Sequence, residues 1–407
     1  MTQYFTNERI LECLEDRVLA GGNGYRSDVR LEDADVIVEN RSAFLDAVDS
    51  SADVIGIPGN IQINLSGQDF TLSGQTIVSD RGVDGSAGAL LYTTDRGESS
   101  PAWDGGSNGR GVLTMQNGSR LSGVRYRGPF HDYYDDPRYP GYIPLDDGDS
   151  YAERQEMRRE RYARGIHILG DGVEIDNCEI YGWPMQAIAI GSSSIVVSPH
   201  LHHLYGHDCM MVGAGYVIDV FNGHPTIEMS YFNATRHAIN GFGHTECGYT
   251  LEDSVIGPST LSHAVDMHAL AENDFGDDLT AGNRVEVRRC TFTFTHGITD
   301  TATQAIAFRG YPEDEYITEN CRFVHEIDGQ EPPENVSNDG GYAPYRQVNV
   351  PHGEWHDWLF QNNQYGISEP HEPGVGAPVN LDDPMAGQPL IDEERRRGLR
   401  IALRSLE

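Results

Sequence analysis

The sequence contains no lysine. All 29 of its basic residues are arginine, against 63 aspartate and glutamate residues, and the formal net charge is −34. The acidic residues are spread along the whole chain instead of forming a tail. A surface of this kind stays hydrated through self-repulsion, which halophilic proteins exploit, so we predict a halophilic origin. The missing lysine argues against an ordinary acidic protein and excludes a lysine general base.

The charge also limits the partners. At low salt so acidic a surface repels nucleic acids and anionic membranes, and we predict neither nucleic-acid binding nor membrane insertion. The sequence has no apolar run of the roughly 18 residues that a spanning helix needs. Residues 1–20 lack the basic and long apolar regions of a secretory signal, so we expect no export signal. At about 1 M salt the screening length falls to ~3 Å, and only local contacts then decide binding.

Cysteine is scarce. The six cysteines, at positions 13, 178, 209, 247, 290 and 321, form no C-x-x-C pair and no zinc-binding spacing. We therefore predict buried, reduced thiols. Disorder is excluded because 38% of the residues are hydrophobic, with 20 tyrosines and 13 phenylalanines among them.

Seven short segments repeat one pattern, in which a strand-like run, a turn and an apolar end residue follow one another. They are VEIDNCEIYG (173–182), HLHHLYG (200–206), TIEMSYFNAT (226–235), YTLEDSVIGP (249–258), VEVRRCTFTF (285–294), YITENCRFVH (316–325) and WLFQNNQYG (358–366). The end residues are Ile180, Leu204, Phe232, Ile256, Phe292, Phe323 and Tyr365, at intervals of 24, 28, 24, 36, 31 and 42 residues. A base period near 24 residues with variable insertions is typical of a β-solenoid, in which each coil buries its apolar row by stacking on the next.

Small residues precede several of these end residues, namely Cys178, Ser254, Cys290 and Cys321. We expect them to stack on one another inside one turn of the solenoid. The predicted fold is all-β, a single-stranded right-handed parallel β-helix with an N-terminal capping helix and a C-terminal helical tail. A β-sandwich or a propeller is the alternative.

The chain divides into three parts. Residues 1–52 form an N-terminal helical cap or attachment segment, with amphipathic helices expected at 7–20 and 42–48. Residues 53–366 form the parallel β-helix, interrupted by a long insertion at 129–164 that is rich in tyrosine, aspartate and proline. Residues 367–407 form an extended loop and a C-terminal amphipathic helix, with acidic residues first and arginines later, as the helix dipole favours.

A polar residue recurs in five tetrads that follow the strand ends. These tetrads are MQAI (185–188), HDCM (207–210), RHAI (236–239), SHAV (262–265) and THGI (295–298). They place Gln186, Asp208, His237, His263 and His296 in one column of stacked strands that lie ~4.8 Å apart. Such a column can bind a sugar through hydrogen bonds or supply a general acid and base. The alternative is a polar ladder that lines a turn and bonds only to backbone.

The segment HAVDMH brings three further polar residues close together. Asp266 and His268 lie two positions apart, so they face the same side of a strand. With His263, and with His237 or His296 from a neighbouring coil, they could hold a metal ion. No H-E-x-x-H motif supports this site. We predict that no cofactor is required and leave Ca²⁺ or another divalent metal open.

Two stretches resemble the pectate-lyase-like superfamily of right-handed parallel β-helices. They are SAFLDAVDSSADVIGIPGNIQINLSG (42–67), similar to the helix-capped start of that fold, and TIVSDRG (76–82), similar to the strand and turn that follow. TRHAI (235–239) and SHAVDMHAL (262–270) resemble β-helix proteins of halophilic archaea. The resemblance covers roughly residues 40–365. It implies the fold more than an activity, because the same fold serves lyases, hydrolases, isomerases and viral tailspikes.

The resemblance also suggests catalytic groups. Lyases of this superfamily use arginine or lysine as the base, often with Ca²⁺, so Arg236 or Arg309 could serve by analogy. The polygalacturonase motifs are incomplete, because Asp277-Asp278 and His296-Gly297 match two of them in reversed order and R-I-K is absent. The catalytic candidates are therefore His237, His263, Asp266 and Arg236, and the candidates for substrate binding are Gln186, Asp208, His268, His296 and Arg309.

An extracellular glycan-binding fold without an export signal suggests a virion protein, because lysis would deliver it outside the cell. We therefore expect a spike- or turret-like virion surface protein that recognises, and in one version processes, host polysaccharide or glycoprotein. It would be a homotrimer attached to other virion proteins through its terminal helices. One alternative is a polysaccharide lyase or glycoside hydrolase of a halophilic archaeon, located in the cytoplasm if no export route exists. A purely structural assembly protein is the second alternative.

Overall fold

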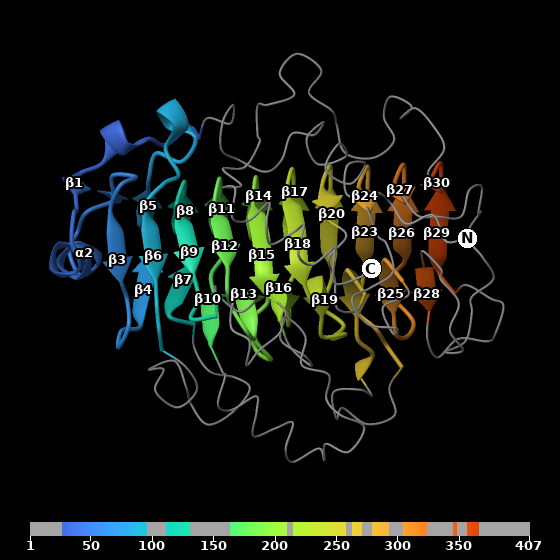
Figure 1. Ribbon diagram of the computed structural model, residues 1–407. Helices are drawn as coiled ribbons and strands as arrows, with labels where there is room; N and C mark the ends of the chain where they lie inside the picture. Colours follow the sequence, from blue (N-terminus) through green and yellow to red (C-terminus); the bar gives the residue numbers. More distant parts are fainter. Residues whose placement is uncertain are drawn as a thin grey trace, which may run out of the picture.

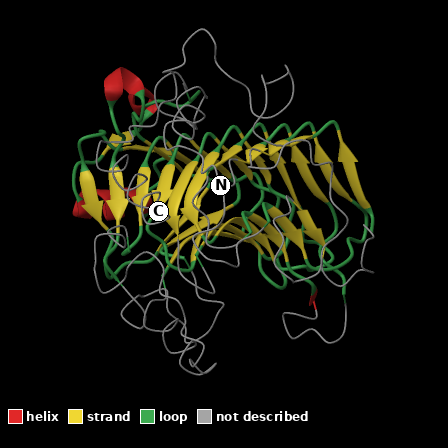
Figure 2. Ribbon diagram, turned by 45° about the vertical axis from the view of Figure 1, so that its right-hand side comes forward, coloured by secondary structure: helices red, strands yellow, loops and turns green. Residues whose placement is uncertain are grey.

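The computed structural model describes residues 27–95, 111–130, 163–209, 215–257, 263–270, 279–292, 304–323, 345–347 and 356–365. Within them, short strands repeat in three sheets that we name A, B and C in the order in which the chain visits them. Successive coils lie side by side along one axis, from the N-terminal strands at one end to β29 and β30 at the other (Figures 1 and 2).

Sheet A has the order β1 (Val36–Ile37), β2 (Val54–Gly56), β5 (Thr76–Val78), β8 (Arg120–Ser122), β11 (Glu174–Asp176), β14 (His200–His202), β17 (Thr226–Glu228), β20 (Tyr249–Glu252), β23 (Val285–Arg288), β26 (Tyr316–Glu319) and β29 (Trp358–Gln361). Sheet B has the order β3 (Gln62–Asn64), β6 (Leu90–Tyr92), β9 (Arg125–Arg127), β12 (Glu179–Tyr181), β15 (Tyr205–Cys209), β18 (Tyr231–Thr235), β21 (Val255–Ile256), β24 (Thr291–Phe292), β27 (Arg322–Phe323) and β30 (Gln364–Tyr365). Sheet C runs from β4 (Phe70–Ser73) through β7 (Leu113–Gln116), β10 (Arg164–Ile168), β13 (Gln186–Ile190), β16 (Tyr216–Val220), β19 (His237–Gly241), β22 (Val265–Met267) and β25 (Ile306–Phe308) to β28 (Tyr345–Gln347). The helical elements are η1 (Leu31–Asp33), α2 (Arg41–Val48) and η2 (Val83–Gly85).

Every pairing between these strands is parallel, and each strand pairs with its counterpart one coil away. This arrangement confirms the predicted parallel β-helix and excludes a sandwich of antiparallel sheets. Apolar residues in register fill the interior. In sheet C one such row consists of Ile166, Ile188, Ile218, Ile239, Val265 and Ile306, all fully buried. Burial of this continuous row stabilises each coil only through its neighbours.

The predicted row of strand-end residues lies in sheet B, with one correction. Ile180, Phe232, Ile256, Phe292, Phe323 and Tyr365 are in register, but the coil between the first two contributes Gly206 and not Leu204. A Cβ atom at Gly206 would lie 2.8 Å from the Phe232 ring. The glycine therefore makes room for the large side chain of the next coil, and Leu204 belongs to the preceding turn.

The turn from sheet A to sheet B repeats in every coil from β8 onward. One residue of this turn has a positive φ, and in successive coils it is Gly123, Asn177, His203, Met229, Asp253, Arg289, Asn320 and Asn362. The small residues predicted to stack come directly after it. Ser254 Oγ donates to the carbonyl of Glu252 at 2.7 Å, and Cys290 Sγ donates to that of Arg288 at 3.3 Å. These bonds cap the strand that has just ended. The cysteines of the described residues, Cys178, Cys209, Cys247, Cys290 and Cys321, are free and buried, as predicted.

Helix α2 lies at the N-terminal end of the stack, where the sequence predicts a short helix (Figure 1). The Asn40 side chain caps this helix by accepting a hydrogen bond from the backbone N–H of Ala43. Phe44 of the helix is buried and packs edge-on against Phe70, with the two ring centroids 5.3 Å apart. The helices predicted at 7–20 and in 367–407, and residues 131–162 of the predicted insertion, lie outside the described residues.

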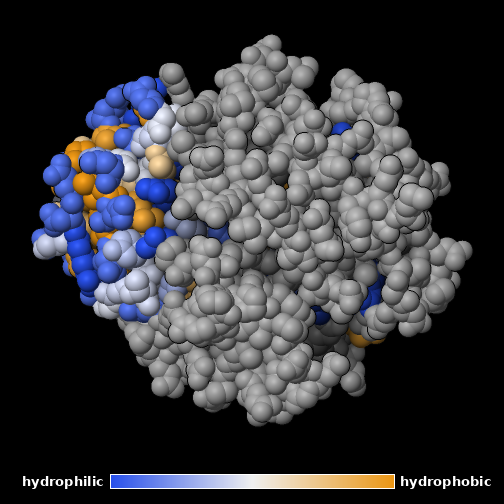
Figure 3. All heavy atoms as spheres, in the orientation of Figure 1, coloured by the Kyte–Doolittle hydropathy of each residue, from blue (hydrophilic) through white to orange (hydrophobic). Residues whose placement is uncertain are grey.

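The N-terminal end of the stack presents hydrophobic and hydrophilic atoms side by side (Figure 3). Edge strand β1 contributes Ile37, whose exposed fraction is 46%. Among the residues described, no helix has the length and apolar character needed to cross a membrane.

Candidate functional site

Three of the five predicted column residues share one row of sheet C. Gln186 on β13 and His237 on β19 are in direct register through Tyr216 on β16, and Arg164 on β10 extends the row in the other direction. His263 occupies the equivalent position of the next coil, two residues before Val265. We call Arg164, Gln186, Tyr216, His237 and His263 the polar row.

Of the other two column residues, Asp208 does not fall where the sequence predicts, and the prediction for His296 is untested. Asp208 lies on β15 in sheet B, where its carboxylate contacts His207 Nδ1 at 2.8 Å, and Tyr216 takes its place in the row. His296 lies outside the described residues, and the register assigns the next position in the row to Gln304. The misplacement of Asp208 has a simple cause. The tetrads were aligned by sequence spacing, whereas pairing between strands sets the register and loops of different length separate the strands.

A second row, which sequence reasoning missed except for its last member, runs beside the first. Asp219 on β16, Asn240 on β19 and Asp266 on β22 are in register on three successive coils, and we call them the carboxylate row. All three are buried. The segments VID (217–219), AIN (238–240) and AVD (264–266) share an acid or amide directly after two apolar residues, and this signal could have located the row.

Asp219 lies at the centre of a network of neutral amides. Its carboxylate accepts hydrogen bonds from Gln186 Nε2 at 2.5 Å and Asn240 Nδ2 at 2.6 Å, while Gln186 Oε1 accepts from Arg164 Nε at 2.5 Å. Burial raises the pKa of Asp219 to about 6, against the opposing effect of these hydrogen bonds and of Arg164. Asp219 can therefore exchange a proton close to neutral pH.

Asp266 has the opposite electrostatic environment. Arg309, which follows β25, donates to both of its oxygens, from Nε at 3.1 Å and from Nη2 at 2.5 Å. His237 Nε2 and His268 Nε2 each lie 3.5 Å from Asp266 Oδ2. Burial disfavours the charged form of Asp266, but the charge of Arg309 outweighs burial and holds the pKa of Asp266 far below the ordinary value. Asp266 is therefore ionised at neutral pH.

His237 has a defined tautomer. Its Nδ1 contacts the backbone carbonyl oxygen of His263, which can only accept, so Nδ1 carries the proton. Burial, together with Arg236 and His263, lowers the pKa of His237 well below its ordinary value and keeps the ring neutral. Nε2 then presents a lone pair toward Asp266. Two acceptors that face each other in this way can both be satisfied only by a group that carries two donor protons.

Several polar atoms around Asp266 have no hydrogen-bond partner within the described part of the chain. They are His237 Nε2, His263 Nδ1 and Asn240 Oδ1. Buried polar atoms are nearly always paired, so three at one place call for an explanation, and a ligand is one. The cluster reaches the surface at Arg309 and His268, whose side chains are 20% and 17% exposed.

The structure thus brings together His237, His263, Asp266, His268 and Arg309. Arg236 lies at the side of the cluster, where Nη1 donates to the Tyr216 hydroxyl at 2.7 Å. The assignment of catalytic and substrate-binding roles to these residues remains a prediction. The metal site considered for His263, Asp266 and His268 would have to compete with Arg309 for Asp266.

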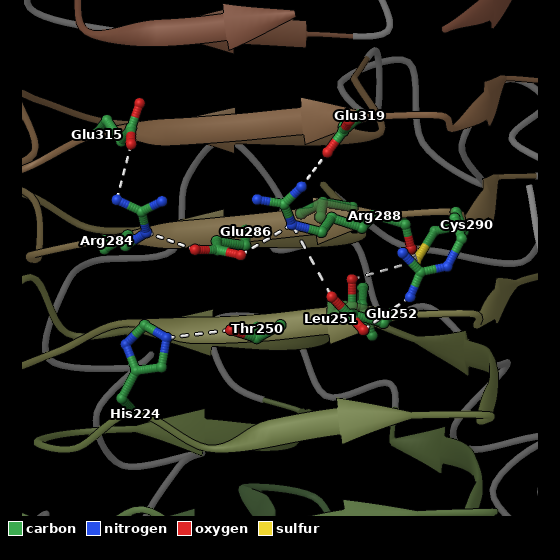
Figure 4. A network of polar contacts seen from close by, with 12 residues as sticks. His224, Thr250, Leu251, Glu252, Arg284, Glu286, Arg288, Cys290, Glu315 and Glu319 are labelled. Atoms are coloured by element: carbon green, nitrogen blue, oxygen red, sulfur yellow. Dashed lines mark hydrogen bonds and ion pairs between the residues drawn. The ribbon is translucent and has the colours of Figure 1, made fainter. Parts of the chain in front are cut away.

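The outer face of sheet A carries a different polar network (Figure 4). Arg284, directly before β23, and Arg288, the last residue of β23, pair with carboxylates of the same and the neighbouring coils. Arg284 Nη1 lies 2.7 Å from Glu315, and Arg288 Nε lies 2.9 Å from Glu286. These side chains are partly exposed, so each pair contributes about 0–1 kcal/mol. We assign this network to cohesion between coils.

No family model and no curated protein matches the sequence. Solved structures are similar in fold. An exopolygalacturonase from Thermotoga maritima is 10% identical with a TM-score of 0.42, and the match covers 89% of this chain and 85% of that one. A pectate lyase from a Bacillus species is 12% identical with a TM-score of 0.33, covering 89% and 88% of the two chains. Tailspike protein 3 of bacteriophage CBA120 is 11% identical with a TM-score of 0.32, covering 84% and 62%. Similarity at this level assigns no role to any residue of this chain.

Proposed function

We propose that this protein recognises an acidic glycan at the cluster around Asp266 on sheet C. The observation that carries the proposal is the pair of partly exposed side chains Arg309 and His268, which lead from the surface to buried Asp266. Beside that ion pair lie three buried polar atoms with no hydrogen-bond partner in the described residues, His237 Nε2, His263 Nδ1 and Asn240 Oδ1. Sugar hydroxyls both donate and accept hydrogen bonds, so they complement atoms of either kind.

The local charge favours an anionic glycan. Arg236, Arg309 and Arg346 all act electrostatically on His263, and Arg164 lies in the same row. These four guanidinium groups face only two carboxylates, Asp219 and Asp266, in the described part of the cluster. A locally cationic site on a chain of net charge −34 would direct carboxylated or sulfated sugars to this place.

Hydrolysis of the bound glycan is the second candidate, and the separated pKa values of the two aspartates favour it. Asp219, with its pKa raised to about 6, would act as the acid, and ionised Asp266 as the base. Their strands lie two coils apart, a backbone spacing of about 9.6 Å at ~4.8 Å per coil, which is just above the carboxyl separations of about 6.5–9.5 Å in inverting enzymes. Both side chains are fully buried, so turnover requires displacement of their neighbours, whereas binding at Arg309 and His268 does not. Recognition is therefore the better-supported function.

The test uses the full chain at the high salt that its surface calls for, titrated with acidic and neutral polysaccharides and with halophile envelope glycoprotein. Calorimetry measures binding, and an assay for reducing ends measures cleavage. We expect binding to an acidic glycan that His237→Gln weakens at least tenfold, with Glu286→Gln on sheet A as a matched control that leaves it unchanged. Equal affinities for the His237 variant and the wild type would refute the site.

We extend the proposal to a virion surface protein of a halophilic system that recognises the host envelope as a homotrimer, attached to the virion through its terminal segments. The absence of lysine and the net charge of −34 support the halophilic part. Light scattering at high salt tests the trimer, and immunogold labelling of virions tests the location. A monomer that binds no envelope material would instead favour the structural assembly protein.

A further inference from the structure

We propose that Glu174, His200 and His202, on the outer face of sheet A, form a binding site for a divalent transition-metal ion such as Zn²⁺. The ligand atoms that these three side chains offer all lie within 4.8 Å of one another. The site is formed by β11 and β14 of sheet A, so it is independent of the proposed glycan site on sheet C.

The backbone places the three side chains on one face. His200 and His202 are two positions apart on β14, so both point outward, and their ring centroids are 4.3 Å apart. Glu174 on β11 is the direct register partner of His200. Its Oε1 already lies 3.0 Å from His202 Nε2, close to the separation of about 3.4 Å between ligands bound to zinc at ~2.0–2.1 Å in a tetrahedral site.

Two further contacts orient the imidazole rings. His200 Nε2 contacts Glu228 Oε1 at 2.7 Å, and His202 Nδ1 contacts His203 Nδ1 at 2.9 Å. Partners of this kind, which hold the rings of metal-binding histidines, are a regular part of metal sites.

The competing contact of Glu174 can be given up. Arg120 Nη2 lies 3.2 Å from Glu174 Oε1, but Arg120 Nε also donates to Asp176 at 2.8 Å. If Glu174 turns to a metal ion, Arg120 keeps its bond to the fully buried Asp176. The side chains of His200 and Glu174 are 43% and 31% exposed, so they have room to close the remaining distance.

The donor set determines the class of ion. Two imidazole nitrogens and one carboxylate suit zinc and its neighbours in the first transition row, whereas Na⁺, Mg²⁺ and Ca²⁺ prefer oxygen ligands only. The site can therefore select a trace metal in concentrated salt. The bound ion would link the coils of β11 and β14, and it would raise the apparent stability because it binds the folded state.

The test strips the full chain with a chelator and titrates it with Co²⁺, whose visible absorption reports a tetrahedral site with nitrogen ligands, and with Zn²⁺ in a calorimeter. We expect one equivalent to bind and the melting temperature to rise. His200→Gln should weaken binding by more than about 100-fold, because that is the largest effect usually seen when only a hydrogen-bond partner of a metal ligand is lost. His202→Gln gives a second loss if it folds. His224→Gln is the matched control, because His224 contacts Thr250 on β20 and is not one of the three ligands.

Two results would overturn the proposal. One is unchanged Co²⁺ absorption in His200→Gln and in Glu174→Gln, whose exposed positions tolerate substitution without unfolding. The other is a wild-type chain that binds no metal at millimolar concentrations, which would leave the cluster as a set of hydrogen-bonded histidines. Neither result bears on glycan binding at sheet C.

Discussion

Asp219 is predicted to reduce the stability of the protein at neutral pH. Its pKa is raised from 3.8 in the unfolded chain to about 6 in the fold, so between these values the native state holds a proton that the unfolded state has released. Stability therefore falls as the pH rises through this window, because the folded state binds more protons. From the two pKa values, the loss between pH 4.5 and pH 7 is about 2 kcal/mol.

The variant Asp219→Asn removes this titration while keeping the size of the side chain. It introduces an NH₂ group beside Gln186, which costs about 1–3 kcal/mol if the hydrogen bond is lost. That cost is independent of pH. From pH 4.5 to pH 7 the unfolding free energy of the wild type should therefore fall by about 2 kcal/mol relative to that of the variant.

Urea unfolding at constant high salt, followed by circular dichroism at several pH values, measures this difference. Asp208→Asn on sheet B is the matched control, because it makes the same acid-to-amide change on a strand of another sheet, away from the carboxylate row. If the profile of Asp219→Asn runs parallel to that of the wild type across the window, Asp219 is ionised in the folded state. The acid role proposed for it would then be untenable.

Three further substitutions test the packing and the cluster. Gly206→Ala brings a Cβ atom to 2.5 Å from Val217 Cγ1 and 2.8 Å from the Phe232 ring and should cost about 1–3 kcal/mol in unfolding free energy. Val217→Ala in the same chain should recover part of this cost, and additive losses would contradict the packing argument. Met229→Asn should raise the unfolding free energy by up to about 1 kcal/mol, because asparagine tolerates the φ of 48° at this turn. If Met229→Asn is no more stable than Met229→Ala, the backbone of Met229 is not strained at this turn. Arg309→Met leaves the Asp266 charge buried without its main partner and should lower the unfolding free energy by about 3–5 kcal/mol. Adding Asp266→Asn should restore most of this loss. A small loss that Asp266→Asn does not restore would mean that the ion pair is not formed.

The sequence predicts the coil architecture well because the period comes from burial. A residue such as Phe292 or Phe323 must face the interior in every coil, so its recurrence survives loops of any length. Leu204 was misplaced because it is apolar and buried too, although it belongs to a turn and Gly206 holds the row position. Spacing alone cannot separate these two kinds of burial.

The candidate site was harder to predict because it depends on which residues the register brings together. Gln186, His237 and His263 fell into one row, since each lies just before an apolar pair that starts a sheet C strand. Asp219 was missed because a single acid within an apolar strand has meaning only beside Asn240 and Asp266 on the next coils. The pairing of Arg309 with Asp266 spans 43 positions and no local pattern indicates it.

Because each strand pairs only with its counterparts one coil away, the chain can fold in the direction of its synthesis. Every finished coil offers an open edge on which the next one forms, as nearest-neighbour stability in solenoids allows. The cluster on sheet C is then assembled late. β16 and β19 supply Asp219 and Asn240 early, but Asp266 receives its arginine only after β25 has left the ribosome. A nascent chain that stops before that point would carry the carboxylate row without the cation that neutralises it.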